Sequence, residues 1–101
     1  MTRKQILETA EKCVNSDRNE KYGSPEDNFA IIGAFWSTYV GKIITASDVA
    51  AMMGLLKIAR IKSTKGQDVD SWVDLSGYGA CGGGLISQHA ENYPVGGEYE
   101  S

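Results

Sequence analysis

The chain has 101 residues, of which 42% are hydrophobic and 23% charged, and its formal net charge is −3. This length fits one domain with a limited core, and domains of this size are often stabilised by association with other chains. The composition is that of a soluble globular protein, and the negative charge argues against a general nucleic-acid-binding surface. Since the longest apolar stretch is too short for a bilayer and carries charges, we expect no membrane span and a cytoplasmic protein.

Two helices are predicted in the first part of the chain. The first is predicted over residues 2–16, because Thr2 and Gln5 have the spacing of a capping box and apolar residues then recur at helical intervals. The second is predicted over residues 25–40, because Ser24 can cap it and a proline follows at the first helical position. Apolar residues surround this second helix, so we expect both of its sides to be buried.

Two further helices are predicted in the second part. The third is predicted over residues 46–64 and begins with another capping box, formed by Thr45 and Asp48. Its middle is apolar nearly all round, which indicates packing against several neighbours. The fourth is predicted to start near Asp68 and to run at least to Cys81. A run of three glycines then weakens the helical pattern, although Leu85, Ile86 and His89 could continue the helix.

No segment alternates between polar and apolar residues as a half-buried strand does. The predicted fold is therefore an all-α bundle of about four helices, in a homo-oligomer. Residues 1–91 are expected to form the domain, and residues 92–101 a flexible acidic tail. The two cysteines, Cys13 and Cys81, have no metal-like spacing and are interpreted as reduced thiols of the core.

Four charged residues are predicted to meet between the third and fourth helices. Lys57 and Arg60 lie on one side of the third helix, and Asp70 and Asp74 share a face of the fourth. A short turn makes these helices antiparallel neighbours, which brings Arg60 level with Asp74. Either the four side chains form ion pairs that hold the helices together, or the carboxylates bind a divalent cation while Lys57 or Arg60 contacts phosphate.

Other candidate residues have two interpretations each. Glu26 and Asp27 lie in the first turn of the second helix, where they either interact with the helix dipole or provide further cation ligands. Tyr22 lies in a plain turn or in a loop that stacks on a base, and Tyr78 is a second candidate to lie under a base. No phosphate-binding loop, zinc-like cluster or catalytic triad is recognisable, since the single histidine, His89, lies close to the tail.

Several blocks of the sequence resemble a family of small, mostly phage and prophage proteins of uncharacterised function. These blocks occur in order and are KYGSPEDNF at 21–29, the region around Trp36, DVAAMMGLLKIAR at 48–60 and WVDLSGYGAC at 72–81. If a phage encodes the chain, the expected location is the host cytoplasm. The family is distantly similar to the all-α nucleoside triphosphate pyrophosphohydrolases of the MazG type, which are helical oligomers that use Mg²⁺.

The resemblance implies a site. Asp70 and Asp74 stand where the second acidic motif of those enzymes falls, with the spacing DxxxD instead of ExxD. The first motif, EExxE, is not present on the third helix, where Asp48 is the only acid. Three functions follow as hypotheses: a Mg²⁺-dependent pyrophosphohydrolase in which Lys57 and Arg60 stabilise the transition state, a nucleotide-binding protein without catalysis, and a helical oligomer that binds a protein partner.

Overall fold

The computed structural model describes residues 1–15 and 23–88 of the chain. Helices account for most of these residues, and no strand occurs among them, so the predicted all-α fold is confirmed. None of the described helices has the length and hydropathy needed to cross a membrane. The predicted tail lies outside the described residues. The helices are α1 (Arg3–Asn15), α3 (Pro25–Val40), α4 (Ala46–Ser63) and α5 (Val69–Gln88).

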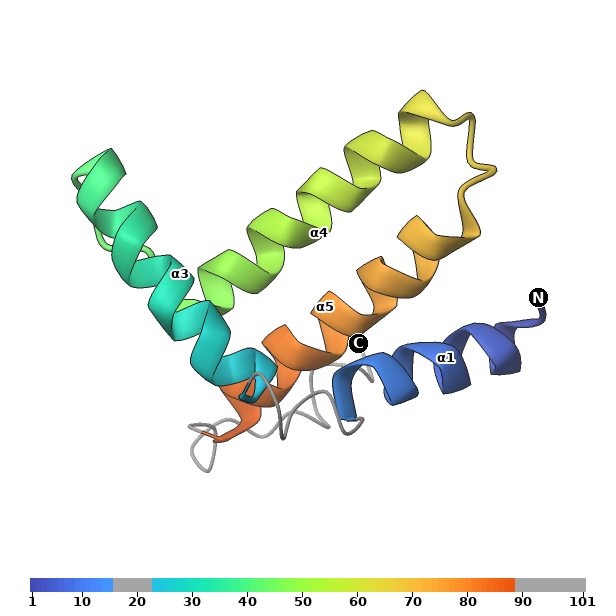
Figure 1. Ribbon diagram of the computed structural model, residues 1–101, viewed down its shortest axis with the longest axis horizontal. Coiled ribbons are helices and arrows are strands. Elements are labelled where there is room, and N and C mark those ends of the chain that lie inside the picture. Colours follow the sequence, from blue (N-terminus) through green and yellow to red (C-terminus); the bar gives the residue numbers. More distant parts are fainter. Residues whose placement is uncertain (16–22, 89–101) are drawn as a thin grey trace, which may run out of the picture.

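The helices form an open arrangement built on one helical hairpin. Figure 1 shows α4 and α5 side by side and antiparallel, whereas α3 diverges from the beginning of α4 and α1 lies next to α5. The pair α4 and α5 has the most extensive contacts of any two helices, which confirms that they are antiparallel neighbours. The hairpin is therefore the element against which α1 and α3 are positioned.

The helix starts follow the predicted capping chemistry. At α1, the Thr2 amide donates to the Gln5 side chain at 2.8 Å, and the Gln5 amide donates to the Thr2 hydroxyl at 3.2 Å. At α4, the Thr45 amide donates to the Asp48 carboxylate at 2.9 Å, and the Asp48 amide donates to the Thr45 hydroxyl at 3.2 Å. Ser24 caps α3. Each cap satisfies backbone donors that the first helical turn leaves unpaired.

Helix α5 continues through the three glycines to Gln88, beyond the point where the sequence pattern weakens. The reason is close packing against α4, because a Cβ atom at Gly82 would lie only 3.2 Å from the Cβ of Ala50. The missing side chain allows the two helices to approach, and the contact outweighs the low helix propensity of glycine.

The core is small and lies where α3, α4 and α5 meet. Its buried side chains are those of Phe29, Val49, Ala50 and Cys81. Cys13, by contrast, is exposed, so the prediction of a core thiol is wrong for this residue. Its place near the end of α1, at the edge of the hairpin, explains the difference.

The junction between α3 and α4 depends on a glycine. A Cβ atom at Gly33 would lie 2.7 Å from the carbonyl oxygen of Ile44, so only glycine lets the connecting segment approach α3 this closely. Ser37 completes the junction, since its hydroxyl accepts a hydrogen bond from the Ile44 amide at 2.7 Å. These contacts set the angle at which α3 leaves the hairpin.

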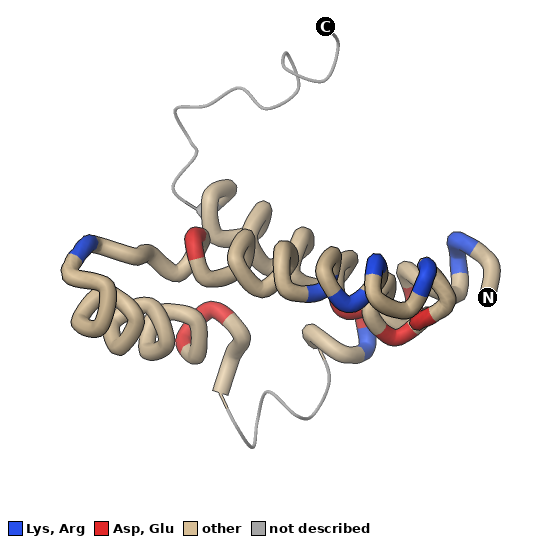
Figure 2. Tube along the Cα trace, turned by 90° about the horizontal axis from the view of Figure 1, so that it is seen from above, with Lys and Arg blue, Asp and Glu red and all other residues tan. Residues whose placement is uncertain are grey.

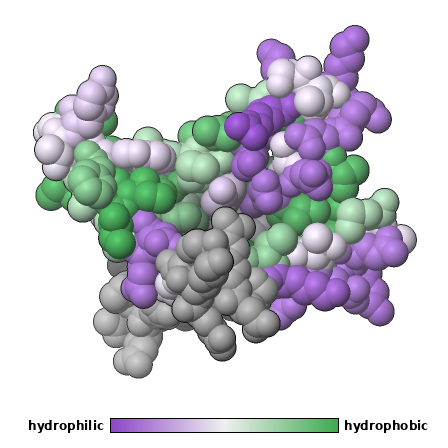
Figure 3. All heavy atoms as spheres, in the orientation of Figure 1, coloured by the Kyte–Doolittle hydropathy of each residue, from purple (hydrophilic) through white to green (hydrophobic). Residues whose placement is uncertain are grey.

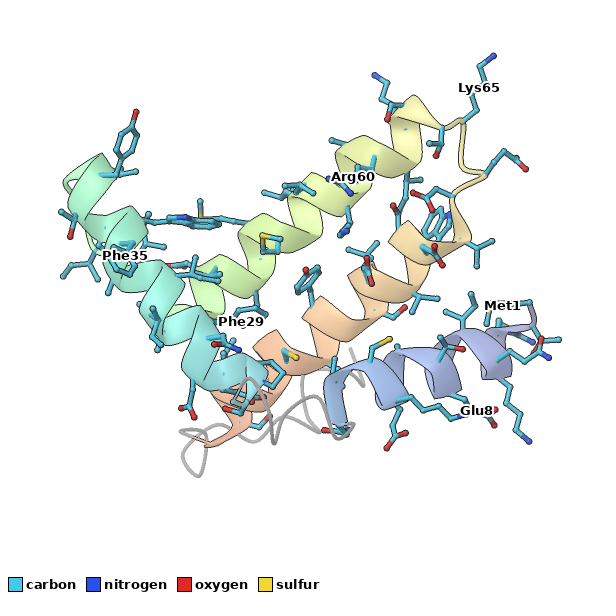
Figure 4. All side chains as sticks on the ribbon, viewed as in Figure 1. Met1, Glu8, Phe29, Phe35, Arg60 and Lys65 are labelled. Carbon is cyan, nitrogen blue, oxygen red and sulfur yellow. The ribbon has the colours of Figure 1, made fainter. Side chains whose placement is uncertain are left out.

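Only one side of α3 is buried by the chain itself, so the expectation of burial on both sides is not met within a single copy. Phe29 lies near the junction of the helices, whereas Phe35, on the outer side, is 71% exposed (Figure 4). Tyr39, one turn further on, is 93% exposed. Figure 2 shows charges only near the two ends of α3, at Glu26 and Asp27 and at Lys42 after the helix.

Candidate functional site

One ion pair joins α4 to α5 at the position where the sequence predicts a charged cluster. The ammonium nitrogen of Lys57 lies 2.9 Å from a carboxylate oxygen of Asp74. The Lys57 side chain is only 12% exposed, while that of Asp74 is 40% exposed. A nearly buried ammonium group needs a partner, and Asp74 supplies it.

The other two charges of the predicted cluster do not join this pair. Asp70 and Arg60 are both exposed, and neither forms an ion pair within residues 1–15 and 23–88. Arg60 lies in the second half of α4 (Figure 4). The register of the hairpin differs slightly from the expected one, so that Lys57, instead of Arg60, reaches Asp74.

A cavity of about 230 Å³ lies beside the ion pair. Its walls come from α1, the beginning of α3 and the middle of α5, and Asp74 is the acidic residue that lines it. Ligand pockets typically combine a mostly apolar lining with a few convergent polar groups. Asp74 therefore faces both Lys57 and a space in which a small molecule fits.

Aromatic rings form part of the cavity wall. The ring centroids of Phe29 and Tyr78 are 5.9 Å apart, with an interplanar angle of 41°. Both residues line the cavity, so Tyr78, a predicted substrate-binding residue, lies in the same site as Asp74. Tyr22, the other predicted aromatic contact, lies outside the described residues. An aromatic surface next to a carboxylate can hold a flat, polar ring.

A second carboxylate influences this cavity. Burial raises the pKa of the Cys81 thiol, which lines the cavity, and the negative charge of Glu26 raises it further. Glu26 is half-buried in the first turn of α3, whereas its neighbour Asp27 is exposed. Cys81 is therefore an uncharged thiol near neutral pH, and Glu26 lies close enough for its charge to act on the cavity.

The four predicted metal ligands do not form one group. Asp74 lines the cavity and Glu26 acts on it, while Asp70 and Asp27 are exposed. Among residues 1–15 and 23–88, no three histidine, cysteine, aspartate or glutamate side chains are placed to hold a metal ion together. The magnesium site stays a prediction.

A further acidic residue near Lys57 was not identified as a site residue from the sequence. Asp68 caps α5: its carboxylate accepts hydrogen bonds from the Ser71 hydroxyl at 2.6 Å and the Ser71 amide at 3.3 Å. The hydrogen bond from the Ser71 hydroxyl is the largest cause that lowers the pKa of Asp68, and the positive charge of Lys57 also lowers it, while partial burial opposes both. The position of Asp68 just before a helix already indicates a cap, and only the folded hairpin brings Lys57 close.

The chain matches the model of a protein family described as a domain of unknown function, DUF6378, over residues 5–86. It is 40% identical over 89 residues to the Gene 55 protein of Mycobacterium phage D29, and this match covers 88% of the chain and 58% of the relative. It is 39% identical over 92 residues to the Gene 55 protein of Mycobacterium phage L5, covering 90% of the chain and 58% of the relative. No solved structure matches the chain significantly.

The chain thus spans a little more than half the length of these curated relatives. The family match includes α3, α4 and most of α1 and α5, and so it contains the ion pair and the cavity. Because the match extends over most of the chain, this protein belongs to the DUF6378 family of small phage proteins.

Proposed function

We propose that the protein binds a nucleotide, with the base or nucleoside part in the cavity between α1, α3 and α5. The observation that carries this proposal is the position of Asp74, which lines a cavity together with Phe29 and Tyr78. A volume of about 230 Å³ is below the roughly 300–1,000 Å³ of typical ligand pockets, which suits part of a nucleotide and leaves its phosphates outside.

Two cations of α4, Lys57 and Arg60, are candidates to bind the phosphates. Lys57 is held at Asp74, and Arg60 is exposed on the same helix. An arginine side chain contacts phosphate oxygens through two parallel N–H groups, so Arg60 is the residue suited to bind the phosphates. The site would then hold the base by stacking and the phosphates by charge.

A second candidate function is the Mg²⁺-dependent hydrolysis of (d)NTPs to the monophosphate and pyrophosphate. It is favoured by the resemblance to enzymes of the MazG type and by two carboxylates, Asp74 and Glu26, that act on one cavity. These are the residues that would hold the ion. Magnesium bound there would neutralise phosphate charge and activate a water molecule.

The test is calorimetric titration with each dNTP, with and without Mg²⁺, together with an assay of released pyrophosphate. We expect binding that Asp74→Asn weakens at least about tenfold, equivalent to about 1.4 kcal/mol. Asp70→Asn is the matched control, because it removes an exposed carboxylate one turn away that does not line the cavity. Circular dichroism of both variants checks that the helices are intact.

Each outcome selects one function. Pyrophosphate release by the wild type that is lost in Asp74→Asn supports hydrolysis. Binding without release supports a protein that sequesters nucleotides. Absence of heat across the whole panel would rule out both and leave the third hypothesis, a helical oligomer that binds a protein partner.

A further inference from the structure

One exposed side of α4 is apolar over several turns. Met52 is 40% exposed, Leu55 64% and Ile58 50%. Two exposed alanines, Ala51 and Ala59, flank these residues. A surface helix normally places charged and polar residues on its outer side. The outer side of α4 therefore has the composition of a helix that packs against another helix.

Charges appear only at the two ends of this apolar stripe, which comprises Ala51, Met52, Leu55, Ile58 and Ala59. Asp48 lies seven residues before Leu55, and Lys62 lies seven residues after it, on the same side of the helix. Both side chains are exposed. If two α4 helices pack antiparallel about a two-fold axis at Leu55, Asp48 of each copy lies beside Lys62 of the other. Two antiparallel copies of α4 therefore place opposite charges next to each other at both ends of the stripe.

A groove runs beside the stripe, between α4 and α5. It has a volume of about 340 Å³, and its lining is mostly apolar. Small residues contribute to it from both helices, including Gly54 of α4 and Gly79 and Gly82 of α5, while Leu55 and Ile86 add larger side chains. Bulky side chains of a helix packed on the stripe can enter a groove of this kind.

The exposed apolar area is large for a single small domain. Figure 3 shows hydrophobic residues over both α3 and α4. The large apolar side chains that are at least 40% exposed include four on α3, Ile43 after it and four on α4. A contiguous exposed apolar surface on a small protein marks a site of interaction.

We propose that a second copy of this chain covers the stripe, in a two-fold dimer in which the two α4 helices pack antiparallel. The chain supplies both halves of such an interface, namely the apolar stripe and the charges that complement each other across it. Two-fold dimers are the commonest assemblies of soluble proteins. The residues of the stripe do not line the candidate nucleotide cavity, so a substitution at Leu55 changes no residue assigned to nucleotide binding.

The first test is the molar mass of the full chain in solution, measured by light scattering after size exclusion. We expect twice the chain mass of 10.9 kDa. Leu55→Glu places two like charges at the axis and should give a monomer. Leu7→Glu is the matched control, because Leu7 is also 64% exposed but lies on α1. A monomeric wild type, or a dimer that persists in Leu55→Glu, overturns the proposal.

The second test fixes the direction of the two helices. In a Cys13→Ser background, Leu55→Cys should be joined between copies by a short bismaleimide, because the axis passes through this position. Lys62→Cys should not be joined, since the two copies of residue 62 lie at opposite ends of an antiparallel pair. Cross-linking at residue 62 and not at residue 55 would indicate a parallel pair and contradict the proposed interface.

Discussion

The inner and outer sides of α3 and α4 carry similar side chains but have very different surroundings. On the inner side, Phe29 is 7% exposed and Val49 is fully buried. On the outer side, Phe35 and Leu55 are 71% and 64% exposed. A hydrophobic composition alone does not say which neighbour covers a helix. One copy of this chain therefore leaves part of the apolar surface of α3 and α4 uncovered.

The charged residues on the inner and outer sides of α4 also differ in their surroundings. The one lysine on the inner side of α4, Lys57, has a partner at 2.9 Å on α5. The two charged residues at the ends of the outer stripe, Asp48 and Lys62, form no ion pair within residues 1–15 and 23–88. Inside the chain the charge is neutralised by the chain itself. On the outer side, neutralisation would come from a second copy.

The largest expected effect compares the two phenylalanines of α3. Phe29→Ala removes a buried ring from the core and should lower the free energy of unfolding by about 3–5 kcal/mol. Phe35→Ala removes an exposed ring and should change it by less than about 0.5 kcal/mol. Urea unfolding of both variants measures the difference. Equal losses of stability would show that the outer side of α3 is also buried in the assembly. The difference between the inner and the outer side would then not hold for α3.

The second largest effect is expected at the close contact between Gly33 of α3 and the Ile44 carbonyl oxygen. Gly33→Ala forces a methyl group against the Ile44 carbonyl oxygen, 2.7 Å away, and should cost about 1–3 kcal/mol. Gly83→Ala is the control, because a Cβ there meets nothing within 4 Å and alanine favours the helix by about 0.5–1 kcal/mol. Thermal unfolding should therefore shift in opposite directions. A neutral Gly33→Ala would mean that the connecting segment can move away from α3 without cost.

A smaller loss of stability is expected for the ion pair, and it should depend on which of the two partners is removed. Asp74→Ala leaves the nearly buried Lys57 ammonium unpaired and should cost about 1–2 kcal/mol, below the value for a fully buried pair because Asp74 is partly exposed. Lys57→Met should cost less than about 1 kcal/mol, since the carboxylate left behind can bind water. The double variant should recover part of the loss. If the two single variants lose equal stability, Lys57 is better solvated than its 12% exposure indicates.

The elements of this fold follow largely from the sequence. The capping residues Thr2, Ser24 and Thr45 start the helices where predicted, because a cap depends on residues within one turn. The antiparallel hairpin was also predictable, since a short turn leaves few alternatives. The exact end of α5 was not predictable, because the continuation of this helix through its glycines depends on the contact between Gly82 and Ala50 of α4.

The candidate site was predictable only in part. The spacing placed Arg60 level with Asp74, but Lys57 lies there instead, because a shift of about one helical turn in the hairpin exchanges the two residues. The cavity combines Cys13, Phe29 and Tyr78 from three helices. No local pattern contains that information, so the angle of α3 and the position of α1 had to be known first.

The smallest expected effect is a pH dependence at the start of α5, on the inner side of the hairpin. Because the pKa of Asp68 is lower in the folded chain than its ordinary value of 3.8, the folded state favours the ionised carboxylate. Its contribution to stability is full above pH 3.8 and is lost as the pH falls through the lower, folded value. Urea unfolding between pH 5 and pH 2 should therefore show a shallower loss of stability in Asp68→Asn than in the wild type.

Ser71→Ala should flatten the profile in the same direction, because it removes the hydroxyl that lowers the pKa of Asp68 most. Parallel profiles in all three proteins would mean that the carboxylate of Asp68 gains nothing from Ser71 and Lys57 on folding. The inner side would then owe its stability to packing and to the pair of Lys57 with Asp74 alone.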